Sequence, residues 1–277
     1  MGCGFAEVGT VTPRPQKANS GVIVDRSIED QALWNKMGFP SNGLEDFYFN
    51  LRDFKHHSQF PVFSNIGKNR TTPNSEASLD YIELMQRLTE VSDLFVLNIS
   101  SPNTKGLREL AQPDYLNDFL NPIINFNKKL SKPKPLLLKL SPDLSEEELI
   151  IILNTACEIG IDGFVLTNTT LSRSTSKQFP SEGGVSGLPL KTLSLTALTI
   201  AANYLKTKGY TQGQNKKLLI SVGGVMTAHD VFERIKLGAD LVQVYSALTF
   251  SGPSFFRNVA EHALAAETNT HKEENGK

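Results

Sequence analysis

Cysteine is scarce in this 277-residue sequence, long apolar runs are missing, and neither sign of charge is in excess. The two cysteines, Cys3 and Cys157, lack the CxxC or Cys/His spacing of a zinc site or a redox pair. No apolar run approaches the roughly 18 residues that span a bilayer, and the N-terminus lacks the charged start and apolar core of a signal peptide. We therefore expect a protein of a reducing compartment, with no metal site and no membrane-inserted segment in this chain.

The charge balance argues against nucleic acid as a partner. Lys and Arg together number 28 against 29 for Asp and Glu, and the resulting net charge of −1 leaves no basic footprint for a phosphate backbone. Length is then the remaining global guide. It fits either two small domains or one α/β barrel, which commonly takes about 250 residues.

Seven short runs rich in Val, Ile, Leu and Phe predict strands. They are near-continuous rather than alternating, as in parallel strands buried on both faces. Helical patterns with defined ends lie between several of them: Ser145 and Glu148 form a capping box for a helix that Gly160 ends, and Thr227 opens another. This alternation predicts βαβ units around a parallel sheet. The runs are 5–11, 61–65, 94–99, 136–140, 163–167, 218–222 and 241–245.

A closed barrel and an open doubly wound sheet both fit this alternation. An open sheet concentrates its site at one crevice, whereas a barrel gathers residues from the ends of many strands. Turns without a function also favour Asn and Gly, so a turn explains a polar residue at any one strand end. It explains polar residues at five strand ends less well. We therefore predict an α/β fold of the (β/α)8 TIM-barrel type, with seven of its eight strands visible in this chain. The residues at the ends of five runs are Asn65, Asn98, Lys139, Asn168 and Gly223.

Three segments lie outside this pattern. The stretches 12–60 and 168–190 are too long for plain connections, and long βα loops of a barrel are normally functional. The segment 267–277 is polar and aperiodic, which predicts a disordered tail. The predicted domain, an incomplete α/β barrel, therefore covers 1–266.

The turn 98–104 carries side chains suited to chemistry. Pro102 stiffens it. Because a serine is a poor base at its ordinary pKa, Ser101 can act as one only in a dry site with a group, such as Thr104, that relays its proton. Taken alone, the local sequence favours a Ser/Asn/Pro turn without a catalytic role.

Two further features point to an anionic ligand. Lys139 lies inside an apolar run, where a charge facing the core needs an anion such as a reduced flavin; a lysine snorkelling from a strand end is the alternative. Gly223-Gly224 and Tyr245-Ser246 end the last two runs, where barrels commonly bind phosphate through backbone N–H groups. Glycine lets phosphate approach the backbone, although a tight turn needs the same residue.

Six motifs in order along the chain resemble those of dihydroorotate dehydrogenase. Each fragment alone is unspecific, but the ordered combination covers nearly the whole chain and is highly specific. In that family the base is cysteine in the soluble class and serine in the quinone-linked class, so Ser101 implies the quinone-linked class, class 2. The motifs are Gly-Thr-Val-Thr-Pro at 9–13, Asn-Lys-Met-Gly-Phe at 35–39, the turn 98–104, Thr-Asn-Thr-Thr at 167–170, Gly-Gly-Val-Ser-Gly at 183–187 and Ser-Val-Gly-Gly-Val at 221–225.

The resemblance implies a reaction and a site. Ser101 would remove a proton from C5 of dihydroorotate while hydride passes from C6 to N5 of FMN, giving orotate in de novo pyrimidine (UMP) biosynthesis, with a quinone as final acceptor. Thr104 and Phe39 resemble residues that frame the proton-exit path, Lys139 would stabilise the reduced flavin, and the loop 172–182 would close over the substrate. The implied substrate-binding residues are Asn35, Lys36, Met37, Gly38, Phe39, Asn98, Asn103, Asn168 and Thr169. The implied FMN-binding residues are Thr10, Asn65, Asn98, Lys139, Thr167, Gly187, Gly223, Gly224, Tyr245 and Ser246.

The sequence departs from the family pattern in two respects. Lys36 replaces the usual arginine, which keeps the charge but loses the planar fork that binds a carboxylate. The first barrel strand and the hydrophobic extension that docks the quinone-linked class on membranes would precede Gly2, so we expect a truncated chain with two unpaired strand edges that is unstable or inactive. The implied location, peripheral on the bacterial cytoplasmic membrane or the mitochondrial inner membrane, depends on that extension.

Two alternatives to this enzyme are considered. The first is another FMN-dependent barrel oxidoreductase, such as a dihydrouridine synthase acting on RNA. Dihydrouridine synthases use a cysteine as the acid and bind RNA on a basic face, and this chain has neither a cysteine near its motif nor an excess of positive charge. An inactive barrel fragment that keeps every motif as a binding module is not distinguished from the enzyme by sequence.

Overall fold

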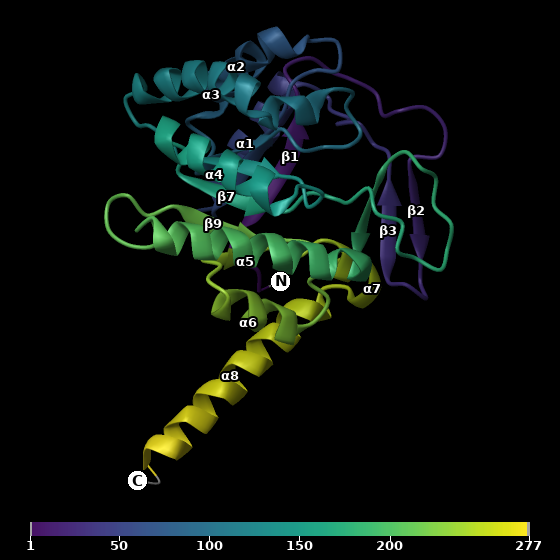
Figure 1. Ribbon diagram of the computed structural model, residues 1–277, viewed down its shortest axis with the longest axis vertical. Coiled ribbons are helices and arrows are strands. Elements are labelled where there is room, and N and C mark those ends of the chain that lie inside the picture. Colours follow the sequence, from purple (N-terminus) through teal and green to yellow (C-terminus); the bar gives the residue numbers. More distant parts are fainter. Residues whose placement is uncertain (1, 276–277) are drawn as a thin grey trace.

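Seven parallel strands form the main sheet of the molecule (Figure 1). The structure, a computed structural model, describes the backbone of residues 2–275 and the side chains as far as residue 265. Every neighbouring strand pair in this sheet is parallel. Each of the seven predicted runs coincides with one of the strands to within a few residues, which confirms the parallel sheet. In spatial order they are β1 (Ala6–Val11), β4 (Val62–Ile66), β5 (Leu94–Asn98), β6 (Leu136–Leu140), β7 (Gly163–Leu166), β9 (Leu218–Ser221) and β10 (Leu241–Val242).

The last strand is shorter than the run 241–245 that predicts it. β10 pairs only with β9, and an edge strand has no second neighbour to extend its ladder. Gln243 still donates its backbone N–H to Ser221 at 2.9 Å. The side chain of Gln243 donates to Glu7 of β1 at 2.8 Å, so the first and last strands of the sheet approach each other as in a barrel.

Helices alternate with the strands, and their predicted ends are confirmed. α4 (Glu146–Ile159) begins with the Ser145/Glu148 capping box and ends at Gly160, whose φ is 110°. α6 (Ala228–Lys236) begins with a second box, formed by Thr227 and Asp230. The other helices are α1 (Leu44–His57), α2 (Ala77–Leu88), α3 (Pro113–Lys128), α5 (Lys191–Thr207), α7 (Ser246–Ser251) and α8 (Ser254–Asn275), with 3-10 turns η1 (Asn74–Glu76), η2 (Leu107–Ala111) and η3 (Leu188–Leu190).

Two apolar cores lie on the two faces of the sheet. The larger joins sheet and helices, for example Leu138 of β6 with Leu120 of α3 and Leu153 of α4. The smaller gathers alternate strand positions that face the other way, as the period of two in a strand requires. Its members are Phe63, Leu94, Val96, Leu137, Val165 and Ile220. This double core is the packing of a barrel wall.

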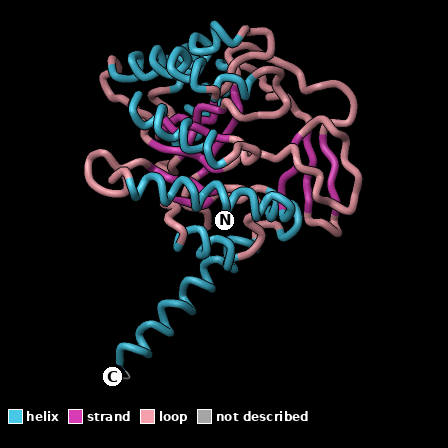
Figure 2. The backbone as a smooth tube through the Cα atoms, viewed as in Figure 1, coloured by secondary structure: helices cyan, strands magenta, loops and turns pink. Residues whose placement is uncertain are grey.

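A second sheet forms inside the two long connections. β2 (Val24–Ser27) and β3 (Ala32–Asn35) pair antiparallel, and β8 (Gly184–Gly187) pairs antiparallel with β3; the three strands lie together at the right of Figure 2. The sequence predicts only loops here, because four-residue strands carry too little periodicity to be recognised. The sheet ties residue 33 to residue 186, so the two connections form one unit.

The last helix, α8, extends away from the rest of the molecule in Figure 1. Its backbone stays helical to Asn275, inside the segment 267–277 for which the sequence predicts a disordered tail. Residues 276 and 277 lie outside the described residues, and the boundary at 266 stays a prediction. Across the described part of the chain, no helix combines the length and the apolar character needed to cross a membrane.

Candidate active site

Polar side chains from four strands meet at the carboxyl ends of the main sheet. Thr10 donates its hydroxyl to Asn65 Oδ1 at 2.6 Å, and Asn98 Nδ2 donates to Thr10 Oγ1 at 2.9 Å and to Asn65 Oδ1 at 3.2 Å. Asn168, just after β7, donates to Asn98 Oδ1 at 3.2 Å. The structure thus brings together four predicted site residues that are up to 158 positions apart in the chain.

Lys139 of β6 has an anionic partner within the chain. Its ammonium lies 2.6 Å from Glu7 Oε1, and the two side chains are 15% and 11% exposed. Asn65 and Gln243 also donate to Glu7. Burial alone raises the pKa of Glu7, but the charge of Lys139 and these hydrogen bonds outweigh it and hold the pKa below its ordinary 4.5. The sequence predicts an anion beside Lys139 but misses Glu7, whose only signal is an acid within the apolar run 5–11.

The predicted base, Ser101, is buried in the turn after β5. It is 5% exposed, and its Oγ accepts the backbone N–H of Asn103 at 3.2 Å. Thr104 is 4% exposed, and within the described part of the chain its hydroxyl has no hydrogen-bond partner. Among the described residues no hydrogen bond joins Ser101 to Thr104, and the proton relay through Thr104 stays a prediction. Phe39 is buried as well, with a positive φ of 56°.

The segment 35–39 packs against this turn. Asn103 Nδ2 donates to the carbonyl oxygen of Asn35 at 3.3 Å and to its side-chain oxygen at 3.0 Å. Lys36, in contrast, places its ammonium 2.7 Å from the carboxylate of Glu182 in the loop after β7. Lys36 therefore ties the segment to that loop, and its contact with a substrate stays a prediction. Met37 and Gly38 complete the segment, and Gly38 has a φ of 73°.

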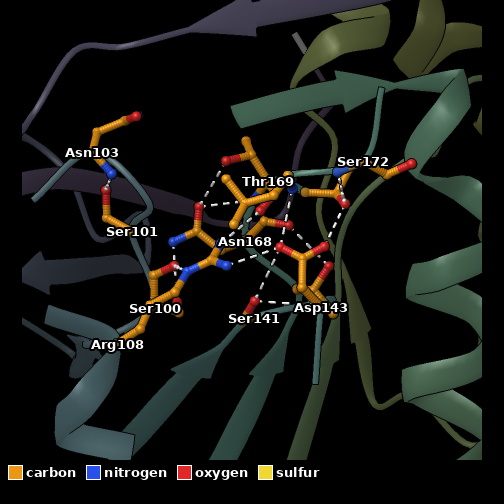
Figure 3. A network of polar contacts seen from close by, with 12 residues as sticks. Ser100, Ser101, Asn103, Arg108, Ser141, Asp143, Asn168, Thr169 and Ser172 are labelled. Atoms are coloured by element: carbon orange, nitrogen blue, oxygen red, sulfur yellow. Dashed lines mark hydrogen bonds and ion pairs between the residues drawn. The ribbon is translucent and has the colours of Figure 1, made fainter. Parts of the chain in front are cut away.

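Arg108 of η2 links the ends of three neighbouring strands (Figure 3). Its guanidinium donates to the carbonyl oxygen of Ser100 at 3.0 Å, to the carbonyl oxygen of Thr169 at 3.2 Å, and to Asp143 Oδ2 at 2.9 Å. Asp143 in turn accepts the hydroxyl of Thr170. Arg108 thereby holds the loops after β5, β6 and β7 together directly beside Ser101. The sequence analysis misses it, although its planar fork suits such multiple contacts.

The loop 171–183 is held in place by two charged residues. Arg173 donates to the backbone carbonyls of six residues, at 2.8 to 3.2 Å. Asp30, just before β3, accepts the N–H and hydroxyl of Ser176 at 2.9 and 3.0 Å. The loop predicted to cover the substrate is therefore docked on the small sheet. The six carbonyls belong to Leu171, Ser172, Pro180, Ser181, Glu182 and Gly183.

A cavity of about 600 Å³ lies at the same end of the sheet. Gly224 lines it and cannot be replaced, because a Cβ there would lie 2.4 Å from the Cα of Lys191. Among the described residues none accepts the backbone N–H of Gly224 or Val225, so two donors are free at this turn. Gly187 is not part of the cavity lining. It pairs with β3, and a Cβ at this position would lie 2.1 Å from the carbonyl oxygen of Gln31, just before that strand. Predicted site residues in the lining are Asn35, Lys139, Thr167, Asn168, Thr169, Gly223, Gly224, Tyr245 and Ser246.

Comparison with known proteins adds an independent line of evidence. The family model for dihydroorotate dehydrogenase matches residues 1–266. The chain belongs to the dihydroorotate dehydrogenase family. Quinone-dependent dihydroorotate dehydrogenases from Sulfurimonas denitrificans and Thermus thermophilus are 39% and 42% identical to it, over 94% of this chain and 70% and 72% of theirs.

Solved structures agree with this family. The crystal structure of the Eimeria tenella dihydroorotate dehydrogenase in complex with ferulenol matches with a TM-score of 0.87 and 33% sequence identity, covering 97% of this chain and 76% of that chain. The ligand-free form matches with a TM-score of 0.84. The predicted family, the barrel-type fold and the assignment as an oxidoreductase are confirmed. The roles of single site residues stay predictions.

Proposed function

We propose that this chain oxidises dihydroorotate to orotate in de novo pyrimidine biosynthesis, with FMN as the hydride acceptor and a quinone as the final electron acceptor. The observation that carries the proposal is the burial of Ser101 in the turn that also carries Asn98 and Asn103, in a chain similar to quinone-dependent dihydroorotate dehydrogenases. Proton removal by a serine requires a dry site, and the 5% exposure of Ser101 meets that condition.

The residues at the cavity fit FMN. The free N–H groups of Gly224 and Val225 are suited to a phosphate, and the lack of space for a Cβ at Gly224 lets the backbone itself make the contact. Lys139 in the lining supplies a positive charge and a donor for a flavin ring, and Asn65 and Asn98 belong to the hydrogen-bond network that adjoins it through Glu7. When bound, FMN accepts the hydride that leaves the substrate.

The side chains around Ser101 have separate tasks in this proposal. Asn35, Asn103 and Asn168 offer amide groups that bind and orient a small planar polar substrate. Ser101 accepts the C5 proton, and Thr104, whose hydroxyl has no partner among the described residues, would frame with Phe39 the path by which that proton leaves to solvent. The ion pair with Glu7 holds the ammonium of Lys139 in place, so that positive charge lies where the negative charge of the reduced ring would develop.

The acceptor also bears on where the protein works. Because long-chain quinones dissolve in lipid, we propose that the protein acts as a peripheral protein at a membrane, either the bacterial cytoplasmic membrane or the mitochondrial inner membrane. The support is the similarity to quinone-dependent relatives.

Substitution of the base tests the function directly. In Ser101→Ala, the anaerobic bleaching of bound flavin by dihydroorotate should slow by about 10²- to 10⁴-fold, the usual contribution of a general base. Orotate binding, measured by the shift in the flavin spectrum, should change little, which controls for a damaged site. Retention of most of the bleaching rate would refute the base. A wild-type protein that binds FMN but is not bleached by dihydroorotate would point to another FMN-dependent barrel oxidoreductase.

A further inference from the structure

Arg234 of α6 is a buried cation without a carboxylate partner. Its side chain is 0% exposed, and none of the ion pairs among the described residues includes it. The guanidinium donates to neutral oxygens instead: Ser221 Oγ at 2.8 Å, Ser194 Oγ at 3.0 Å and the carbonyl of Gly223 at 2.5 Å. Its Nε has no acceptor. The carboxylates whose charge reaches Arg234, those of Asp230 and Glu233, make no hydrogen bond to it among the described residues, so its direct contacts are all neutral.

The nearest acids are committed to another cation. Lys191 lies 2.5 Å from Asp230 and 3.3 Å from Glu233, so one ammonium pairs directly with two carboxylates, and these also act on Arg234 through their charge. The same contacts argue against a metal at the group formed by His229 with these two acids. Burial lowers the pKa of Arg234 to about 10, so the guanidinium stays charged at neutral pH.

The carbonyl held by Arg234 belongs to the peptide that joins Gly223 to Gly224 at the cavity. Because this peptide is trans, the carbonyl oxygen and the N–H of Gly224 point in opposite directions. Arg234 at 2.5 Å and Ser194 at 2.6 Å both hold the oxygen on the protein side. The N–H of Gly224 is therefore turned away from them, and both glycines line the cavity.

We propose that Arg234 is a positioning residue for an anionic phosphate, the phosphate group of FMN, bound at the Gly223–Gly224 turn; this rests on the function proposed above. Arg234 orients the peptide so that its N–H faces the phosphate. It also places a full positive charge directly behind the turn, in a poorly solvated region where charges interact strongly.

Comparison of FMN with riboflavin tests the proposal, because the two ligands differ only in the phosphate. Apoprotein is titrated with each, and binding is followed by quenching of flavin fluorescence, which needs no catalytic turnover. Arg234→Met should raise the Kd for FMN by about tenfold or more while the Kd for riboflavin changes by less than about twofold. Arg234→Lys, which keeps the charge, should recover most of the preference for FMN.

Two control variants separate the charge from other effects. Lys236→Met removes one charge from the exposed side of the same helix and should leave both affinities unchanged. Ser194→Ala removes the other donor to the Gly223 carbonyl without changing charge and should weaken FMN binding less than Arg234→Met does. If Arg234→Met does not fold, Arg234→Gln removes the charge while retaining hydrogen-bond donors.

The outcomes distinguish this proposal from the one on which it rests. Equal weakening of FMN and riboflavin, with a lower Tm, would show that Arg234 only supports the fold and would overturn the proposal. An unchanged preference for FMN in the variant, with normal FMN binding by the wild type, would overturn it while leaving the cofactor assignment intact. A wild-type protein that binds neither flavin would overturn the cofactor assignment and this inference together.

Discussion

Buried charges set the site at the scale of single residues. Glu7 and Lys139 compensate each other inside the sheet, 132 residues apart in sequence, whereas Arg108 divides its donors among an acid and two carbonyls. Arg234 has only neutral partners. The charges of Asp230 and Glu233 reach Arg234 without a direct hydrogen bond among the described residues, so its donors orient the peptide of the glycine turn instead.

The Glu7–Lys139 pair leads to a prediction with a defined pH dependence. Glu7→Gln leaves Lys139 buried without its anion, and we expect the free energy of unfolding at neutral pH to fall by about 3 kcal/mol. Because the folded-state pKa of Glu7 lies below its ordinary 4.5, this contribution is present above 4.5 and is lost as the pH falls through the folded-state pKa. Urea unfolding of wild type and variant should therefore show a deficit that shrinks in acid.

A double variant serves as the control for this pair. Glu7→Gln with Lys139→Met removes both charges and should be less destabilised than Glu7→Gln alone, since no buried cation is left without a partner. A deficit of the same size at every pH would contradict the role of the carboxylate charge.

At the scale of elements, the small sheet holds the two long connections together and anchors the loop between β7 and β8. β2, β3 and β8 join the two long connections, and the loop 171–183 is docked on them through Asp30 and stiffened by Arg173. The hydroxyl of Ser27 and the N–H of Ser176 lower the pKa of Asp30 to about 2. Because that pKa is depressed, the anchor is complete above the ordinary 3.8 and is lost only as the pH falls through about 2.

Loss of that anchor should free the loop. In Asp30→Ala, amide hydrogen exchange across 172–182 should accelerate at neutral pH, because Ser176 and Lys177 lose their acceptor. Asp53→Ala, at an exposed position of α1, is the matched control and should leave exchange in the loop unchanged. Equal exchange in both variants would mean that Arg173 alone holds the loop.

The edges of the main sheet dominate at the scale of the whole molecule. β1 and β10 each pair on one side only within the described sheet. Unpaired parallel edges offer free backbone donors and acceptors to another chain. The side chains of Glu7 and Gln243 bring the two ends of the sheet toward each other without a ladder between them.

Self-association is the expected result of these edges. Purified residues 1–277 should show concentration-dependent association by light scattering, and the association should persist in high salt, because backbone hydrogen bonds are screened far less than surface charges. A monomer at every concentration, with a cooperative thermal melt, would contradict this expectation.

Local chemistry, acting over a few residues, determined the order of strands and helices, the capping boxes at Ser145 and Thr227, and the turn that carries Ser101. The parallel sheet followed from these elements by the rules of βαβ connection, and the ordered motifs indicated the family. Periodicity and capping are readable because they depend only on near neighbours in the chain.

Tertiary structure alone decided which charges are compensated. Glu7 beside Lys139, Arg108 across three strand ends, Arg234 beneath the glycine turn and the pairing of β3 with β8 all join residues that no local pattern relates. Whether such a charge stabilises the fold or prepares a binding site depends on burial and on the full set of neighbours. Both quantities come into existence only when the sheet curls and its two long connections meet.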